Sequence, residues 1–183
     1  MSFFTNRMFT NPEQNILHLG LTEGMRVADF GAGTGFYSKA CSTKVGYTGR
    51  VYAIEVQKDL VKKLESDIKH WGISNIDCIW GDIERRGGTK ISDHSMDAVI
   101  ISNVLFQAED KLGVVDEAKR VLKNDGKVLL IDWSDSFGGM GPTPECVMTE
   151  NTAKELFEKR GFKFLEKIST SAHHYGIIFI YKV

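Results

Sequence analysis

Residues 27–36 read Val-Ala-Asp-Phe-Gly-Ala-Gly-Thr-Gly-Phe, and this stretch carries the strongest local pattern in the sequence. The apolar run that ends at Phe30 predicts a buried strand, and the apolar residues after Gly35 recur at helical spacing. Glycines permit backbone angles that other residues avoid, and they let backbone amides approach a ligand closely. A helix N-terminus next to them favours anionic groups. The stretch therefore predicts a ligand-binding turn at the carboxyl edge of an α/β sheet.

Strand and helix patterns alternate outward from this turn. A helix is expected from Pro12, which follows the cap Asn11, to Gly20. Strands are expected at 26–30, 50–56, 76–80, 96–102 and 127–133, and amphipathic helices at 36–41, 60–72, 114–122 and 153–161. The runs 162–169 and 174–182 are joined by only about four residues, so they must be antiparallel neighbours. Five βα units and one hairpin predict an α/β fold with a doubly wound, mostly parallel seven-stranded sheet and an antiparallel C-terminal hairpin.

Composition places the chain among ordinary globular proteins. Its 183 residues predict one domain over 1–183, and its net charge of -1 argues against a nucleic acid held by charge. The longest apolar run, 175–181, is too short to span a membrane, and no secretory signal is readable. The three widely spaced cysteines fit neither a disulfide framework nor a zinc site. We expect a cytoplasmic protein with reduced thiols, and the sequence leaves a homo-oligomer open.

The spacing of the glycines discriminates between nucleotide sites. A Walker A loop requires Gly-Lys-Ser/Thr, whereas Gly35 is followed by Phe36 and Tyr37. The dinucleotide fingerprint requires a glycine where Phe36 stands. The pattern is instead G-x-G-x-G, with Asp29 two residues before its first glycine.

This motif resembles the first motif of the class I S-adenosylmethionine-dependent methyltransferases. The resemblance extends over about residues 12–133, through Glu55 at the end of the second strand, Asp82 after the third and the Arg120–Lys127 segment before the fifth. It is greatest for the ubiquinone/menaquinone-biosynthesis type and its small-molecule relatives. The resemblance implies a Rossmann-like fold and S-adenosylmethionine as cofactor, with S-adenosylhomocysteine as product.

The resemblance also assigns roles to residues. Asp29 would orient the ammonium group of the cofactor, Glu55 would accept both ribose hydroxyls, and Asp82 would accept the adenine amine. The complete expected cofactor site is Asp29, Gly31, Ala32, Gly33, Thr34, Gly35, Glu55, Val56, Gly81, Asp82, Ile83, Ser102, Asn103 and Val104.

Motifs of several methyltransferase subclasses are missing. Residues 102–105 lack the two prolines of exocyclic-amine enzymes, and Cys146 follows Glu145 rather than the proline of cytosine C5 enzymes. Arsenic methylation needs converging cysteines, whereas Cys41 and Cys78 are expected in the core. The carboxylates of magnesium-dependent enzymes are missing after the fourth strand, so no metal is expected. These absences favour a transferase that acts on a small molecule by proximity and orientation.

Three residues near the predicted cleft are candidates for acid–base catalysis. Asp132 ends the fifth strand, and His173 and His174 begin the last strand. Because the last strand is antiparallel, its start lies at the same edge of the sheet. A histidine can accept a proton from a phenol, amine or thiol, although a local hydrogen-bonding role explains these histidines equally well.

Two other functions remain open. A nicotinamide-dependent oxidoreductase would use Glu55 as its ribose acid, and a non-catalytic cofactor-binding subunit would support a partner protein. For the methyltransferase, we expect a lid made of the N-terminal segment within 1–20 and the loop 134–148. The lid would close over a flat, partly apolar acceptor, with Trp133 and the two histidines at its rim.

Overall fold

The computed structural model describes residues 10–137 and 141–182, and it confirms the predicted seven-stranded sheet. The strand order is β3-β2-β1-β4-β5-β7-β6, in which β1 to β5 are parallel neighbours and β7 is antiparallel to both β5 and β6. The strands are β1 (Arg26–Phe30), β2 (Arg50–Glu55), β3 (Ile76–Trp80), β4 (Met96–Ser102), β5 (Leu122–Trp133), β6 (Phe162–Ile168) and β7 (His174–Tyr181).

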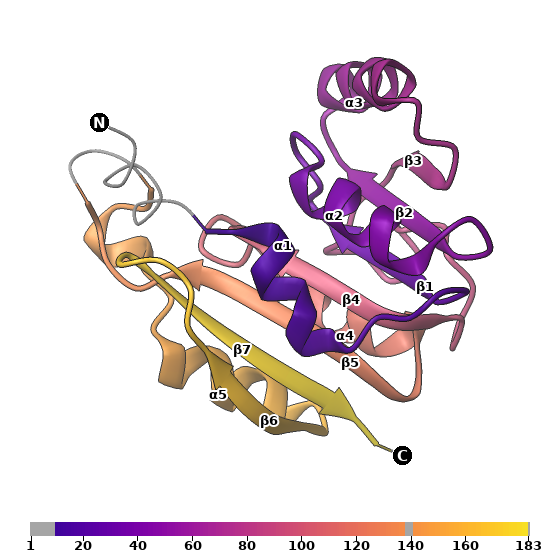
Figure 1. Cartoon of the computed structure of the whole chain (residues 1–183). Helices are drawn as coiled ribbons and strands as arrows, with labels where there is room; N and C mark the ends of the chain where they lie inside the picture. Colours follow the sequence, from indigo (N-terminus) through magenta and orange to yellow (C-terminus); the bar gives the residue numbers. More distant parts are fainter. Residues whose placement is uncertain (1–9, 138–140, 183) are drawn as a thin grey trace.

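Helices cover both faces of the sheet (Figure 1). One face carries α1 (Pro12–Asn15), the 3₁₀ helix η2 (Ile16–Leu19), α2 (Phe36–Val45) and α3 (Lys58–Trp71). The other face carries α4 (Lys111–Val121) and α5 (Glu150–Lys159), and a short 3₁₀ helix η3 (Pro144–Cys146) precedes α5. No helix in the described ranges is long and apolar enough to cross a membrane.

Side-chain alternation divides the core into two layers. In β5, Leu129 and Ile131 pack toward η2 and α2, whereas Val128 and Leu130 pack toward α4 and α5. All four side chains are fully buried, as expected for a strand covered on both faces. The strands at the centre of the sheet are therefore fixed on both sides, and their carboxyl ends form a rigid edge.

The structure differs from the prediction at two connections. The segment 81–95 between β3 and β4 contains no helix, so the described chain has four βα units instead of the five expected. In addition, β5 begins at Leu122 instead of Lys127. The turn Asn124–Gly126 is a bulge inside the strand, because Met96 pairs with Leu122 and Ala98 with Lys127. Asp125 accommodates this bulge with a left-handed φ of 63°.

A stacked aromatic pair anchors the C-terminal hairpin to α5. Phe157 is fully buried, and its ring is parallel to that of Phe179 with centroids 4.3 Å apart. We expect Phe157→Ala to lower the free energy of unfolding by about 3–5 kcal/mol, because it removes the stack and leaves a cavity. Phe164→Ala, at a partly exposed position of β6, should lower it by about 1 kcal/mol at most. Urea denaturation of both variants measures the difference, and equal losses would contradict this account of the packing.

Candidate functional site

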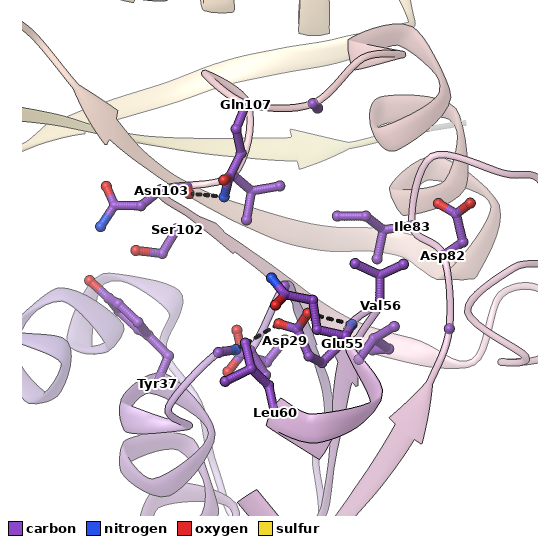
Figure 2. Close-up of a pocket in the computed structure, with 18 of the residues that line it drawn as sticks. Asp29, Tyr37, Glu55, Val56, Leu60, Asp82, Ile83, Ser102, Asn103 and Gln107 are labelled. Atoms are coloured by element: carbon purple, nitrogen blue, oxygen red, sulfur yellow. Dashed lines mark hydrogen bonds between the residues drawn. The ribbon is translucent and has the colours of Figure 1, made fainter. Parts of the chain in front are cut away.

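A cleft with a volume of about 1200 Å³ opens at the carboxyl ends of β1, β2 and β4. It lies where the strand order reverses, because β1 is followed on one side by β2 and on the other by β4. Ligands of doubly wound sheets bind at this switch point, where connections diverge to opposite faces. Figure 2 shows the side chains that point into the cleft from the two halves of the sheet.

The glycine turn forms the floor of the cleft. Gly31, Gly33 and Gly35 all have left-handed φ values, of 71°, 52° and 77°. A Cβ on Gly31 would lie 2.6 Å from Val104 Cγ2, and a Cβ on Gly35 would lie 2.3 Å from Leu64 Cδ1. A Cβ on Gly33, by contrast, would meet only a carbonyl oxygen at 3.9 Å, so this glycine leaves open space. Two of the glycines are required by packing, and the third leaves room beside the turn.

Asp29 lies at the end of β1 and is 2% exposed. Its Oδ2 accepts a hydrogen bond of 2.6 Å from the Ser38 hydroxyl on the first turns of α2. Burial raises the pKa of Asp29 to about 6, because the hydrogen bonds from Ser38 only partly offset the loss of hydration. Asp29 is therefore a buried carboxyl group in the cleft that changes charge near neutral pH.

Glu55 ends β2 and presents its carboxylate to the same cleft. One oxygen accepts the Gly33 amide at 3.2 Å, and the other accepts the Gln57 amide at 2.9 Å. The residue is 7% exposed. Each carboxylate oxygen can accept a further hydrogen bond, so Glu55 can bind a ligand with two neighbouring donors.

The segment after β3 forms a third part of the cleft. Asp82 Oδ1 accepts the Glu84 amide at 3.0 Å, and Oδ2 forms an ion pair of 3.0 Å with Arg85 Nε. Ile83 and Val56 lie beside Asp82 at the same end of the cleft (Figure 2). Val56 is 57% exposed, which is unusual for this side chain. This end combines an acidic acceptor with two apolar side chains, as a flat heterocycle with an amino group requires.

The opposite end of the cleft lies after β4. Asn103 has a left-handed φ of 57°, and its backbone amide donates to the Ile131 carbonyl at 2.9 Å. Its side-chain Oδ1 is buried and has no hydrogen-bond partner among the described residues. Tyr37 lies nearby, and its hydroxyl accepts a hydrogen bond of 2.9 Å from Asn15 Nδ2. A strained residue with an unpaired buried acceptor is typical of a ligand site.

The structure brings together nearly all residues that the resemblance assigned to the cofactor. All of them line the cleft except Gly35, which instead is the N-cap residue of α2 and packs against Leu64. Their individual roles stay predictions. The residues in the cleft are Asp29, Gly31, Ala32, Gly33, Thr34, Glu55, Val56, Gly81, Asp82, Ile83, Ser102, Asn103 and Val104.

Sequence reasoning missed several further residues that line the cleft, among them Tyr37, Leu60 and Gln107. Tyr37 lies two residues after Gly35, and this position on the first turn of α2 is the signal that could have identified it. Gln107 lies in an irregular segment after β4, where its side chain donates to the Asn103 carbonyl at 3.1 Å. No periodic pattern marks that segment.

The three candidate acid–base residues do not line this cleft. Asp132 is fully buried, and its carboxylate accepts the backbone amides of Phe106 and Trp133 at 3.1 and 2.8 Å. These contacts fix the turn after β4 to β5. Asp132 therefore has a structural explanation, and its catalytic role stays a prediction.

The two histidines belong to an aromatic cluster beside β5. His173 Nδ1 lies 2.8 Å from Asp135 Oδ1, and the His173 ring stacks on Phe137 with centroids 3.9 Å apart. The His174 ring lies 4.2 Å from that of Trp133. Burial, followed by the nearby His173, lowers the pKa of His174 to about 4, so His174 is neutral at neutral pH. The proposed lid over this cluster lies partly outside the described residues, because residues 1–9 and 138–140 are not described.

Comparisons with known proteins agree with the geometry of the cleft. The family described as "Methyltransferase domain" matches residues 21–177. A ubiquinone/menaquinone biosynthesis C-methyltransferase of Haemophilus ducreyi is 28% identical over 63% of this chain and 44% of its own length. A human arsenite methyltransferase is 34% identical over 60% of this chain and 31% of its own length. The chain thus matches less than half the length of these relatives.

Solved structures extend the likeness to nearly the whole chain. A SAM-dependent methyltransferase from Aquifex aeolicus superposes with a TM-score of 0.85 and 27% identity. The match covers 94% of this chain and 90% of that one. The structural likeness therefore covers nearly the whole of both chains.

The structural explanation of Asp132 can be tested by its pH dependence. Burial raises the pKa of Asp132 to about 6, so the folded state favours the protonated form. The free energy of unfolding of the wild type should therefore fall relative to that of Asp132→Asn as pH rises from about 4 to about 6, by about 1–3 kcal/mol. Urea titrations across this range measure the difference. Asp125→Asn replaces an exposed aspartate of the same strand as the control, and a pH-independent difference for Asp132→Asn would contradict the explanation.

Proposed function

The chain belongs to the class I S-adenosylmethionine-dependent methyltransferases, and from this membership we propose that it binds S-adenosylmethionine in the cleft and transfers the methyl group to a small-molecule acceptor. One observation carries the proposal. The glycine turn, the carboxylate of Glu55 and the Asp82–Ile83 pair line one continuous cleft at the switch point of the sheet. Three separate segments of the sequence thus supply the complementary groups of one nucleoside site.

The residues of the cleft fit this cofactor. No side chain fills the space beside Gly33, so this space can hold part of the cofactor. The buried Glu55 carboxylate has two oxygens for a ribose diol, and Asp82 lies beside two apolar side chains that suit an adenine ring. Asp29 supplies a counter-charge for an ammonium group at the glycine turn.

The chemistry requires little from the protein beyond orientation. S-adenosylmethionine supplies an already activated methyl group, which is bonded to a positively charged sulfur. The glycine turn and Glu55 hold the donor at the carboxyl edge, and Ser102, Asn103 and Tyr37 line the end of the cleft opposite Asp82 (Figure 2). An acceptor held at that end would be placed to attack the methyl carbon and displace the sulfur. The acceptor would also exclude water from that end of the cleft, which would favour transfer. No metal is part of this proposal.

The acceptor is proposed to be a small organic molecule. Arsenite is not favoured, although one relative is an arsenite methyltransferase. Cys41 is buried in α2, Cys78 lies in β3 and Cys146 is exposed in η3, and none of these three described thiols lines the cleft. We also propose that the N-terminal segment and the loop 134–148 close over the acceptor.

A non-catalytic cofactor-binding subunit is the second candidate function. It is favoured by one observation, which is that Asp132, His173 and His174 all lie outside the lining of the cleft. Co-purification with a partner at fixed stoichiometry, together with no transfer to any acceptor by the chain alone, would support this candidate. An oxidoreductase is disfavoured, because Phe36 stands 66% exposed where a dinucleotide site needs a glycine.

Binding of S-adenosylhomocysteine tests the proposed function. We expect titration calorimetry to give a dissociation constant in the micromolar range for the wild type. The double variant Glu55→Ala/Asp82→Ala should weaken binding about 100-fold or more, because it removes two charged acceptors. The control Asp59→Ala/Glu65→Ala removes two exposed acidic residues from α3 and should bind like the wild type. Absence of binding by the folded wild type would reject the function.

The raised pKa of Asp29 predicts a pH dependence of binding. Its pKa of about 6 in the free protein should fall when an ammonium group binds beside it, so binding releases a proton below pH 6. The affinity for S-adenosylhomocysteine should therefore rise about tenfold between pH 5 and pH 7. Calorimetry in buffers of different ionisation enthalpy measures both the affinity and the proton release. Asp29→Asn should abolish both effects, and an affinity that is flat in the wild type would refute the role of Asp29.

A further inference from the structure

The part of the cleft after β3 lacks the support that the other parts receive. Residues 81–85 line the cleft, but they begin the helix-free connection 81–95. This connection crosses from β3, at one edge of the sheet, to β4 in its centre, past β2 and β1. Neither a regular helix nor strand pairing fixes its position. Its position must therefore come from contacts with a neighbouring element.

A buried carboxylate of α4 supplies the first of these contacts. The Glu117 side chain is fully buried, and it accepts hydrogen bonds from the backbone amides of Gly87 and Thr89 at 2.8 and 3.2 Å. It also accepts the Thr89 hydroxyl at 2.6 Å. All three donors belong to the connection 81–95. Burial alone would raise the pKa of Glu117, but hydrogen bonds from Arg120, Thr89 and Gly87 outweigh it and lower the pKa.

Arg120 completes the network one helical turn later. It donates to both oxygens of Glu117, at 2.8 Å through Nε and at 2.7 Å through a terminal nitrogen. It also donates to the Ile91 carbonyl at 2.7 Å and the Thr89 hydroxyl at 3.0 Å, and it pairs with Asp93. Arg120 belongs to the Arg120–Lys127 segment that carried part of the family resemblance. Its contacts in the structure are with the connection rather than with the cleft.

Close backbone packing transmits this anchorage to the cleft. A Cβ on Gly88 would lie 2.1 Å from the Asp82 carbonyl oxygen, and the Asp82 amide donates to the Gly88 carbonyl at 3.1 Å. A Cβ on Gly81 would lie 2.6 Å from the same Gly88 carbonyl. The residues that Glu117 holds, Gly87 and Thr89, thus flank the residue that touches Asp82. A shift of this part of the connection must move Asp82.

The first turn of α4 adds a second point of contact. Glu84 Oε2 accepts the backbone amide of Asp110 at 2.6 Å, and a Cβ on Gly113 would lie 2.1 Å from the Glu84 carbonyl oxygen. Asp110 caps α4, and the segment from Asn103 to Asp110 lines the opposite side of the cleft. One helix therefore contacts both walls of the cleft.

We propose that Glu117 and Arg120 are positioning residues, which hold Asp82 and Ile83 at the place where they discriminate the adenine base of the cofactor. This inference rests on the proposed function, because it assumes that the cleft binds S-adenosylmethionine. Neither residue touches the ligand in this account. They act through Gly87, Gly88 and Thr89.

Two ligands that differ in one group test this role. S-adenosylhomocysteine carries the adenine amine, and S-inosylhomocysteine carries a carbonyl in its place. The wild type should prefer S-adenosylhomocysteine by about tenfold or more, because Asp82 accepts from the amine. In Glu117→Gln, we expect the affinity for S-adenosylhomocysteine to fall about tenfold and the preference to approach unity. Titration calorimetry with both ligands measures the preference.

Matched variants separate positioning from simple destabilisation. Asp116→Asn makes the same chemical change at the exposed neighbouring position of α4 and should keep both affinities within about twofold of the wild type. Circular dichroism checks that each variant is folded. If Glu117→Gln does not fold, Thr89→Val removes the hydroxyl that donates to Glu117 and accepts from Arg120, and it should lower the preference about threefold.

The outcomes distinguish this inference from the proposed function. No binding of S-adenosylhomocysteine by the wild type would reject the function itself. Binding without any preference in the wild type would overturn the inference while leaving the function in place. An unchanged preference in the folded variant would overturn it as well, including the case in which both affinities fall equally.

Discussion

The cleft depends on one steric constraint, which is that the chain must pass from β1 into α2 beneath two bulky side chains. Val104 lies over Gly31 and Leu64 lies over Gly35, at distances that leave no room for a Cβ. Both glycines also have left-handed backbone angles. This close approach brings the turn between β1 and α2 against the segment after β4 and against α3. The walls of the cleft are therefore adjacent because the turn between them has no side chain at Gly31 or Gly35, where the neighbouring side chains approach.

Buried carboxylates then fix the loops around that turn. Glu55 accepts hydrogen bonds from the backbone amides of Gly33 and Gln57. Asp132 accepts one from the backbone amide of Phe106. Glu117 does the same for the connection between β3 and β4. A carboxylate removed from water needs several hydrogen-bond donors, and the backbone amides of a loop can supply them. The same device thus holds three loops of the carboxyl edge, and of these carboxylates only Glu55 also lines the cleft.

Much of the fold could be predicted from the sequence, because strands such as Ala98–Ile101 and turns such as Gly31–Gly35 carry strong local signals. The bulge at Asn124–Gly126 could not, since its residues are also typical of an ordinary turn, and only pairing with β4 shows that the strand continues. The predicted residues that line the cleft could be found because each lies at the carboxyl end of a strand or shortly after it. The contacts of Glu117 could not be predicted, because a carboxylate on a helix gives no signal of burial until the loop that covers it is placed. For His173 and His174 the sequence predicted a position near the cleft. They lie at the expected edge of the sheet, but they do not line the cleft.

The central claim is that one end of the cleft binds adenine and the other end faces the acceptor. A crystal structure of the protein with S-adenosylhomocysteine tests this claim most directly. The account predicts the adenine ring between Val56 and Ile83, with its amine toward Asp82, the ribose diol on Glu55 and the amino-acid end beside Gly31 and Asp29. A ligand bound outside this cleft, or bound with its adenine beside Tyr37 and Asn103, would contradict it.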